Sequence, residues 1–117
     1  MPTQNPDCLF CKIVTGDVPA TLVAESDLSV AFRDLNPQAP THVLVIPRLH
    51  AATIADLTAV DAASTADLFT LAGRVADDEG VVQGYRLVAN TGPGAGQTVF
   101  HAHVHLLGGR PLTWPPG

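Results

Sequence analysis

An alternating segment near the C-terminus constrains the fold more than any other part of the chain. Over residues 98–107 the side chains alternate in character, a pattern typical of a half-buried β-strand. Because successive side chains of a strand point to opposite faces, His101, His103 and His105 share one face. The other face carries Ala102, Val104 and Leu106. A rise of about 3.3 Å per residue separates neighbouring histidines by about 6.6 Å, too far for a flat strand to hold one ion with all three.

The remaining elements complete an α+β pattern. Short β-branched runs predict four further strands, at residues 21–25, 28–33, 41–46 and 85–90, with Pro47 ending the third of them. The clearest helix covers residues 61–80, where five apolar residues recur at spacings of three and four: Leu68, Leu71, Ala72, Val75 and Ala76. Helical turns are expected at 9–14 and 53–57. One main helix and several strands predict a helix packed on one face of an antiparallel sheet.

The composition excludes several classes of protein. A chain of 117 residues supports one domain, and 46% apolar with 15% charged residues excludes intrinsic disorder. The net charge of -5 argues against binding to nucleic acid or to an anionic membrane. The longest uncharged stretch, residues 87–109, contains glycines, amides and histidines, so we expect no membrane span. Residues 1–7 show no secretion signal, so we expect a cytoplasmic protein.

The row of histidines favours chemistry on a phosphate. A neutral imidazole is a good nucleophile near pH 7, and imidazoles beside it can stabilise anionic oxygens. The row follows a glycine-rich segment at residues 90–98, whose backbone N–H groups can approach an anion closely. The alternative is a strand whose polar face merely carries histidine. It is less favoured, because each partly buried imidazole needs a hydrogen-bond partner.

The His-x-His-x-His segment followed by two apolar residues resembles the histidine-triad family of nucleotide hydrolases and transferases. Further segments are similar to its purine-nucleoside phosphoramidase branch: residues 32–35, 37–47, 96–97, 107–109 and 114–117. The resemblance implies one domain over 1–117, with a five-stranded antiparallel sheet and one long helix. It also implies a homodimer with a continuous ten-stranded sheet, a loose arm at 1–7 and a tail at 110–117 near the partner's site.

The resemblance assigns a role to each polar position. It makes His103 the nucleophile, which attacks the α-phosphorus of a purine nucleotide and forms a nucleotidyl-histidine. His105 would bind phosphate oxygens, and His42 would lie behind the nucleophile to support it. Asn90, Gln97 and Thr98 match positions near the phosphate or the leaving group. The branch commonly has serine where this chain has Thr98, which keeps the hydroxyl. Turn capping is the alternative role for Asn90 and Thr98.

The same resemblance outlines a nucleoside pocket. Asp34 matches a carboxylate that binds the ribose hydroxyls. The apolar surroundings of the base would be Phe10, Ile13, Phe32 and Leu35, although such residues also form ordinary core. Trp114 matches a tryptophan that reaches the active site of the neighbouring subunit. A tail held on the surface of its own subunit is the alternative.

Cys8 and Cys11 form a CxxC pair with three possible roles. Redox chemistry is disfavoured because no strand precedes Cys8, and a disulfide is disfavoured in a cytoplasmic protein. Zinc needs about four nitrogen or sulfur ligands. Prokaryotic histidine-triad proteins that resemble this chain complete the set with histidines matching His50 and His101. Four protein ligands would make the zinc structural, so no metal is expected in the chemistry.

The resemblance therefore predicts an enzyme that hydrolyses purine nucleoside phosphoramidates and takes no cofactor besides a structural Zn²⁺. Two alternatives remain open. One is a different nucleotidyl hydrolase, acting on dinucleoside polyphosphates or nucleotide sulfates. The other is a non-catalytic adaptor that binds purine nucleotides. The complete histidine row favours an enzyme.

Overall fold

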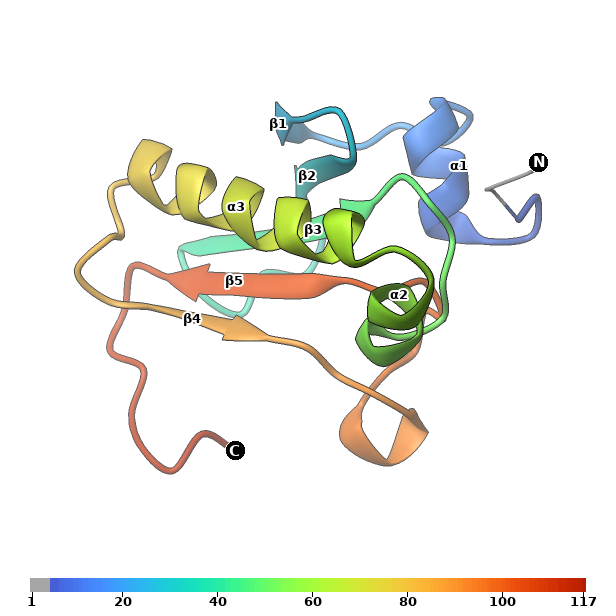
Figure 1. Cartoon of the computed structure of the whole chain (residues 1–117). Helices are drawn as coiled ribbons and strands as arrows, with labels where there is room; N and C mark the ends of the chain where they lie inside the picture. The colour runs from blue at the N-terminus through green and yellow to red at the C-terminus, as the bar shows by residue number, and fades with distance from the viewer. Residues whose placement is uncertain (1–4) are drawn as a thin grey trace.

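The computed structural model describes residues 5–117, which contain one five-stranded antiparallel sheet (Figure 1). The strand order across the sheet is β1-β2-β3-β5-β4. This arrangement confirms the predicted α+β class. The bounds of the strands are β1 (Leu22–Glu25), β2 (Ser29–Arg33), β3 (Thr41–Pro47), β4 (Tyr85–Val88) and β5 (Val104–Gly108).

The long helix α3 (Ala62–Asp78) covers one face of the sheet, as predicted. Asp61 caps it by accepting a hydrogen bond from the backbone N–H of Ser64. Its five predicted core residues are all buried, so the apolar stripe faces the strands. The other helices are short: α1 (Leu9–Thr15), α2 (Ile54–Val60) and the 3₁₀ turn η1 (Pro93–Ala95). None of the described helices is long and apolar enough to cross a membrane.

Two apolar clusters lie on opposite faces of the sheet. The larger cluster joins α3 to Val43 and Val45 of β3 and to Val104 and Leu106 of β5. The smaller cluster lies under α1, on the other face, and contains Phe10, Val30, Phe32, Leu44 and Ile46. Alternate residues of β3 therefore serve different cores, and the pocket-forming side chains come from the face under α1.

The last strand is shorter than predicted: β5 begins at Val104, so the strand prediction was wrong over residues 98–103. Pro47 explains where the pairing stops. Val104 pairs with Val45, and two residues further along the ladder Ala102 would meet Pro47, which has no N–H to donate. The N–H of Ala102 is bonded instead to the carbonyl oxygen of Ala51, at 2.7 Å. Pro47 itself still belongs to β3, so it does not end that strand before residue 47.

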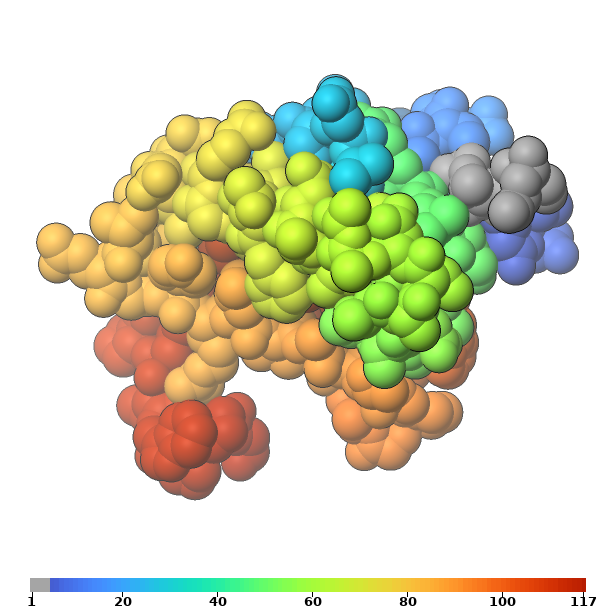
Figure 2. Space-filling view, viewed as in Figure 1, coloured from blue at the N-terminus to red at the C-terminus, as the bar shows by residue number. Residues whose placement is uncertain are grey.

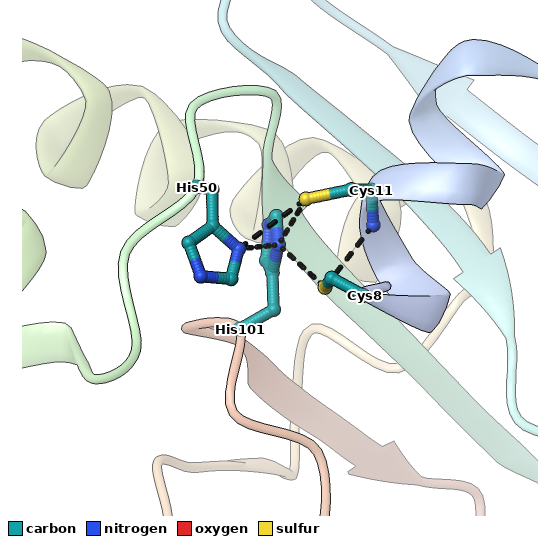
Figure 3. Close-up of side chains that lie close together, drawn as sticks. All are labelled: Cys8, Cys11, His50 and His101. Atoms are coloured by element: carbon teal, nitrogen blue, oxygen red, sulfur yellow. Dashed lines mark hydrogen bonds between the residues drawn. The ribbon is translucent and has the colours of Figure 1, made fainter. Parts of the chain in front are cut away.

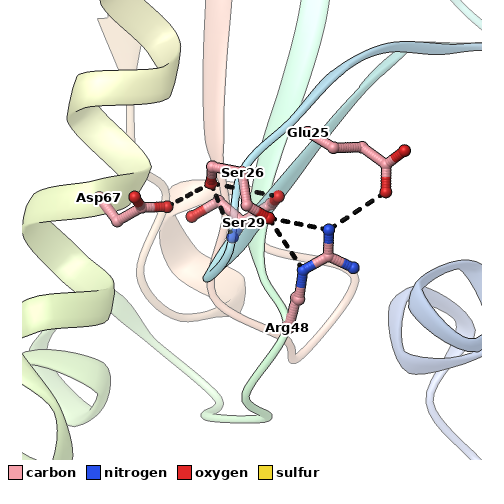
Figure 4. Close-up of polar contacts among 5 residues, drawn as sticks. All are labelled: Glu25, Ser26, Ser29, Arg48 and Asp67. Carbon is pink, nitrogen blue, oxygen red and sulfur yellow. Dashed lines mark hydrogen bonds and ion pairs between the residues drawn. The ribbon is translucent and has the colours of Figure 1, made fainter.

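A polar network fixes the β1–β2 turn against the rest of the sheet (Figure 4). The Ser26 hydroxyl donates to Asp67 of α3, and the guanidinium of Arg48 donates to the Ser26 carbonyl oxygen at 2.9 Å and to Glu25 at 3.1 Å. The turn is thereby joined both to α3 and to the segment that follows β3. This network contains no histidine and stabilises the scaffold.

The segments at the two ends of the chain differ in how they are held. The backbone N–H of Asn5 donates to Cys11 Sγ, and that of Cys8 donates to the Asn5 carbonyl oxygen. Residues 5–7 are thus fixed to α1, while residues 1–4 of the predicted arm lie outside the described residues. In Figure 2, the C-terminal tail and the loop containing η1 project from the same side of the molecule as two separate lobes.

Candidate active site and metal centre

A pocket of about 260 Å³ lies between α1 and the sheet, next to the histidines. Eight residues predicted for the site line it, and they come from α1, the end of β2, the segment before β5, and β5 itself. These residues are Phe10, Ile13, Phe32, Asp34, Leu35, Thr98, His103 and His105. The pocket therefore combines an apolar wall with a carboxylate, a hydroxyl and two imidazoles.

His103 is buried, and one backbone group determines its tautomer. Its Nδ1 lies 2.7 Å from the carbonyl oxygen of His101. A carbonyl oxygen only accepts, so Nδ1 carries the proton and donates it, which leaves the lone pair of the neutral ring on Nε2. Burial lowers the pKa of His103 below 6.5, so the ring is neutral at pH 7. Both effects suit a nucleophile.

His42 lies beside His105, although we expected it behind His103. Nε2 of His42 is 3.0 Å from Nδ1 of His105, and the two ring centroids are 5.2 Å apart. Asp34 Oδ2 lies 3.4 Å from the same His42 nitrogen. Burial lowers the pKa of His42, and burial lowers that of His105 to about 4, so both rings are neutral at pH 7.

Phe10 forms the centre of the apolar wall. Its ring packs edge-on against Phe32 at 5.5 Å and against His103 at 5.1 Å between centroids. Ile13 is partly buried beside it. Leu35, by contrast, is 98% exposed and lies at the pocket rim. Phe10 and Phe32 are thus both core and pocket wall, as the alternative reading of these residues anticipated.

The glycine-rich loop holds itself together with its amide side chains. The buried Gln97 donates to the carbonyl oxygens of Ala52 at 2.7 Å and Val99 at 3.1 Å, and it accepts from the Gly92 N–H. The side-chain amide of Asn90 donates to the Ala95 carbonyl oxygen at 2.7 Å. Neither amide lines the pocket, whereas the exposed Thr98 does.

Trp114 lies outside this pocket and is 81% exposed. Arg86 of β4 holds the tail that carries it, because its guanidinium donates to the carbonyl oxygens of Leu112 at 3.2 Å and Thr113 at 2.8 Å. The tail is thus fastened near the β4 edge of the sheet, while the indole stays open to contact.

Cys8, Cys11, His50 and His101 form a second cluster (Figure 3). Nδ1 of His101 lies 3.4 Å from each cysteine sulfur and 3.2 Å from Nδ1 of His50, which is 3.3 Å from the Cys11 sulfur. Tetrahedral zinc, with bonds of about 2.0–2.3 Å, places such N–N and N–S pairs about 3.3–3.6 Å apart. The donor set and its spacing therefore fit zinc.

The protons of this cluster are arranged for metal binding. Nε2 of His101 lies 2.8 Å from the Pro47 carbonyl oxygen, so it carries the ring proton and leaves the Nδ1 lone pair facing the sulfurs. Burial raises the pKa of the Cys11 thiol to about 11, so a thiolate at this position needs a cation beside it. With four protein ligands the site would be closed, which is typical of structural zinc.

Several pocket residues were not predicted from the sequence. Arg33 lines the pocket, and the further apolar lining comes from Leu9, Val18, Pro19, Ala20, Leu44 and Val99. Arg33 is held by Glu79, with both guanidinium–carboxylate distances at 2.8–2.9 Å, and this hydrogen bonding lowers the pKa of Glu79. Leu44 could have been found, because it shares a strand face with His42.

Known proteins resemble the chain over nearly its whole length. Residues 15–112 match the family model for the HIT domain. Purine nucleoside phosphoramidase of Escherichia coli (strain K12) is 44% identical over 107 residues, 91% of this chain and 90% of that protein. An uncharacterised HIT-like protein of Synechococcus elongatus is 50% identical over 114 residues, 97% of this chain and 100% of that protein. A HIT family hydrolase from Legionella pneumophila Philadelphia 1 has a TM-score of 0.90 at 53% identity, covering 95% of this chain and 100% of that chain.

Proposed function

The chain belongs to the HIT domain family, and we propose that it hydrolyses purine nucleoside phosphoramidates through a nucleotidyl intermediate on His103. One observation carries this proposal. The His101 carbonyl oxygen holds the Nδ1 proton of His103, so the Nε2 lone pair is available for attack. The name of the Escherichia coli relative, purine nucleoside phosphoramidase, supports the choice of substrate class.

The pocket residues suit the parts of such a substrate. The aromatic wall of Phe10 and Phe32 would take the purine base, and Asp34 would accept hydrogen bonds from the ribose hydroxyls. His105 would donate to a phosphate oxygen. The Thr98 hydroxyl, which lies on the pocket wall, would contact the leaving group.

The reaction would proceed in two displacements. His103 Nε2 would form a bond to the α-phosphorus as the P–N bond of the substrate breaks, and the leaving amine would take up a proton from water. Water would then attack the same phosphorus, break the bond to His103 and release one proton to solvent, which offsets the proton taken up by the amine. The products would be a nucleoside monophosphate and the free amine, with the His103 lone pair restored. Each step needs only the pocket residues and water.

Zinc and a second copy of the chain are further parts of the proposal. Zinc held by Cys8, Cys11, His50 and His101 would fix α1, and with it the pocket wall, to the segment before β5. A homodimer with a continuous sheet would join two copies at an edge strand, and β1 and β4 are the edge strands of the described sheet. The exposed Trp114 would then reach the partner's site. We also propose a cytoplasmic location.

The test is hydrolysis of adenosine 5′-phosphoramidate by the full chain and by His103→Ala. We expect release of AMP by the wild type and its loss in the variant. Diadenosine tetraphosphate and adenosine 5′-phosphosulfate, assayed in parallel, would reveal a different nucleotidyl preference if either is cleaved faster. Tight AMP binding without turnover of any of the three would contradict the proposal and favour an adaptor.

A further inference from the structure

Gln38, His42 and His105 form a hydrogen-bonded row beside the pocket. The backbone N–H of Gln38 lies 3.0 Å from Nδ1 of His42, and Nε2 of His42 lies 3.0 Å from Nδ1 of His105. The His42 side chain is only 5% exposed, so water has little access to it. The row connects the loop before β3 to an imidazole of β5.

The Gln38 end determines the direction of every hydrogen bond in the row. A backbone N–H can only donate, so Nδ1 of His42 accepts and the single proton of the neutral ring is on Nε2. That proton is donated to Nδ1 of His105, which places the single proton of His105 on its own Nε2. The lowered pKa values of His42 and His105 agree with this, because a neutral ring carries one proton.

The same geometry disfavours a cation between Asp34, His42 and His105, although their ligand atoms all lie within 4.8 Å of one another. A cation bound to Nε2 of His42 would move the ring proton to Nδ1. That proton would then face the N–H of Gln38, and two donors would oppose each other without an acceptor. Asp34 Oδ2 lies 3.4 Å from Nε2 of His42, where its negative charge favours a proton on this nitrogen rather than its loss.

We propose that the Gln38 backbone and His42 are positioning groups that hold His105 as a hydrogen-bond donor toward the pocket. Within residues 5–117, Nε2 of His105 has no hydrogen-bond partner, so its N–H is available to a substrate oxygen. His103, whose ring centroid is 5.1 Å away, presents a lone pair instead. Two adjacent imidazoles are thereby set in opposite tautomers, one to attack and one to donate.

The use of this donor by an α-phosphate oxygen rests on the proposed function, whereas the tautomer does not. The first experiment therefore measures the tautomer alone, by long-range ¹H–¹⁵N NMR of the full chain labelled at histidine, at pH 7 and without nucleotide. For Nε2 of His105 we expect the ¹⁵N chemical shift of a protonated ring nitrogen. For its Nδ1 we expect the ¹⁵N chemical shift of an unprotonated ring nitrogen. The reverse pattern, or a rapidly exchanging mixture of tautomers, would overturn the proposal.

The second experiment compares two variants of similar polarity. In His42→Gln the amide N–H₂ stands at the ε position and can still donate to His105. In His42→Asn the shorter amide can accept from Gln38 but does not reach His105. We expect His105 to keep its tautomer in the Gln variant and to lose it in the Asn variant, as read by the same NMR signals.

The activity of the two variants gives an independent readout. We expect kcat/KM of His42→Asn to be about 10-fold below that of His42→Gln, the effect of one hydrogen bond. Equal kcat/KM values and equal His105 signals would show that His42 merely fills space, and would overturn the proposal. Should the wild type hydrolyse no nucleotide, the proposed function fails, while the NMR comparison still decides the tautomer.

Discussion

Zinc at Cys8, Cys11, His50 and His101 should stabilise the fold by an amount that can be calculated in advance. The four donor groups come from α1 and its N-cap, the segment after β3 and the segment before β5, so they come together only in the folded chain. Zinc binding is therefore coupled to folding. At a free zinc concentration 100 times the dissociation constant, the gain is about 2.7 kcal/mol.

That free energy converts into a melting temperature. The entropy of unfolding of a 117-residue chain is about 0.25 kcal/mol/K, from a typical value of about 2.1 cal/mol/K per residue. Reloading stripped protein with zinc should then raise Tm by about 11 °C. The assay is differential scanning calorimetry under reducing conditions, in a buffer that fixes free zinc, with the dissociation constant measured separately by competition with a chelator.

Matched variants separate the metal site from general effects on α1. Lys12→Ala alters the same helix beside Cys11 and should keep the full shift in Tm. Cys8→Ser combined with Cys11→Ser should remove the shift in Tm. In Cys8→Ser alone, the loss in free energy of unfolding should exceed the free-energy equivalent of the loss in kcat. An unchanged Tm on adding zinc to reduced wild-type protein, or an equal rise in the double variant, would show that these four residues do not hold a stabilising zinc ion.

Two further predictions concern the scaffold and the histidines. Gly109 has φ +88°, and an added Cβ would meet the Pro40 ring at 3.0 Å, so Gly109→Ala should lower the free energy of unfolding by about 1–3 kcal/mol in urea titrations. Gly84→Ala, where an added Cβ has no atom within 4 Å, should change it by less than about 0.5 kcal/mol, and equal effects would contradict the strain argument. Because burial lowers the pKa values of His42 and His105, both rings stay neutral until the pH falls below 6.5, so kcat/KM should be flat from pH 8 to 6.5. A decline with a midpoint at or above pH 6.5 would refute this.

The sequence predicted the elements because their periodicity is local. The stripe at spacings of three and four predicted residues 61–80, and α3 covers Ala62–Asp78. The extra length predicted for β5 has a non-local cause. The alternation of faces persists before Val104, since Ala102 still packs into the core under α3. The neighbouring strand β3, however, has Pro47 opposite Ala102, and a proline has no N–H to donate. Alternation predicts the face of each side chain and not where pairing ends.

The partner of His42 depends on strand register, which the pattern alone does not determine. His42 lies opposite Leu107, and His105 lies opposite Leu44. The two histidines therefore share a face as diagonal neighbours, within reach of long side chains. A register shifted by two residues would have kept the same faces and changed the partner. The direction of the hydrogen bonds from Gln38 through His42 to His105 depends in addition on the Gln38 backbone N–H, whose position the sequence pattern does not determine.

The two clusters around the histidine row unite residues that are far apart in the chain. Cys8 and His101 are separated by 93 positions, and only the family resemblance connected them in advance. Once folded, His101 belongs to both parts of the site. Its ring faces the cysteines, and its carbonyl oxygen fixes the tautomer of His103.

The nucleophilic role of His103 is tested most directly by finding the covalent intermediate on this residue. The full chain is mixed with adenosine 5′-phosphoramidate, quenched within the first turnover, and examined by intact mass and by peptide mapping. We expect an AMP adduct on His103 and no adduct in His103→Ala. An adduct on another residue, or unchanged turnover by His103→Ala, would contradict the nucleophilic role.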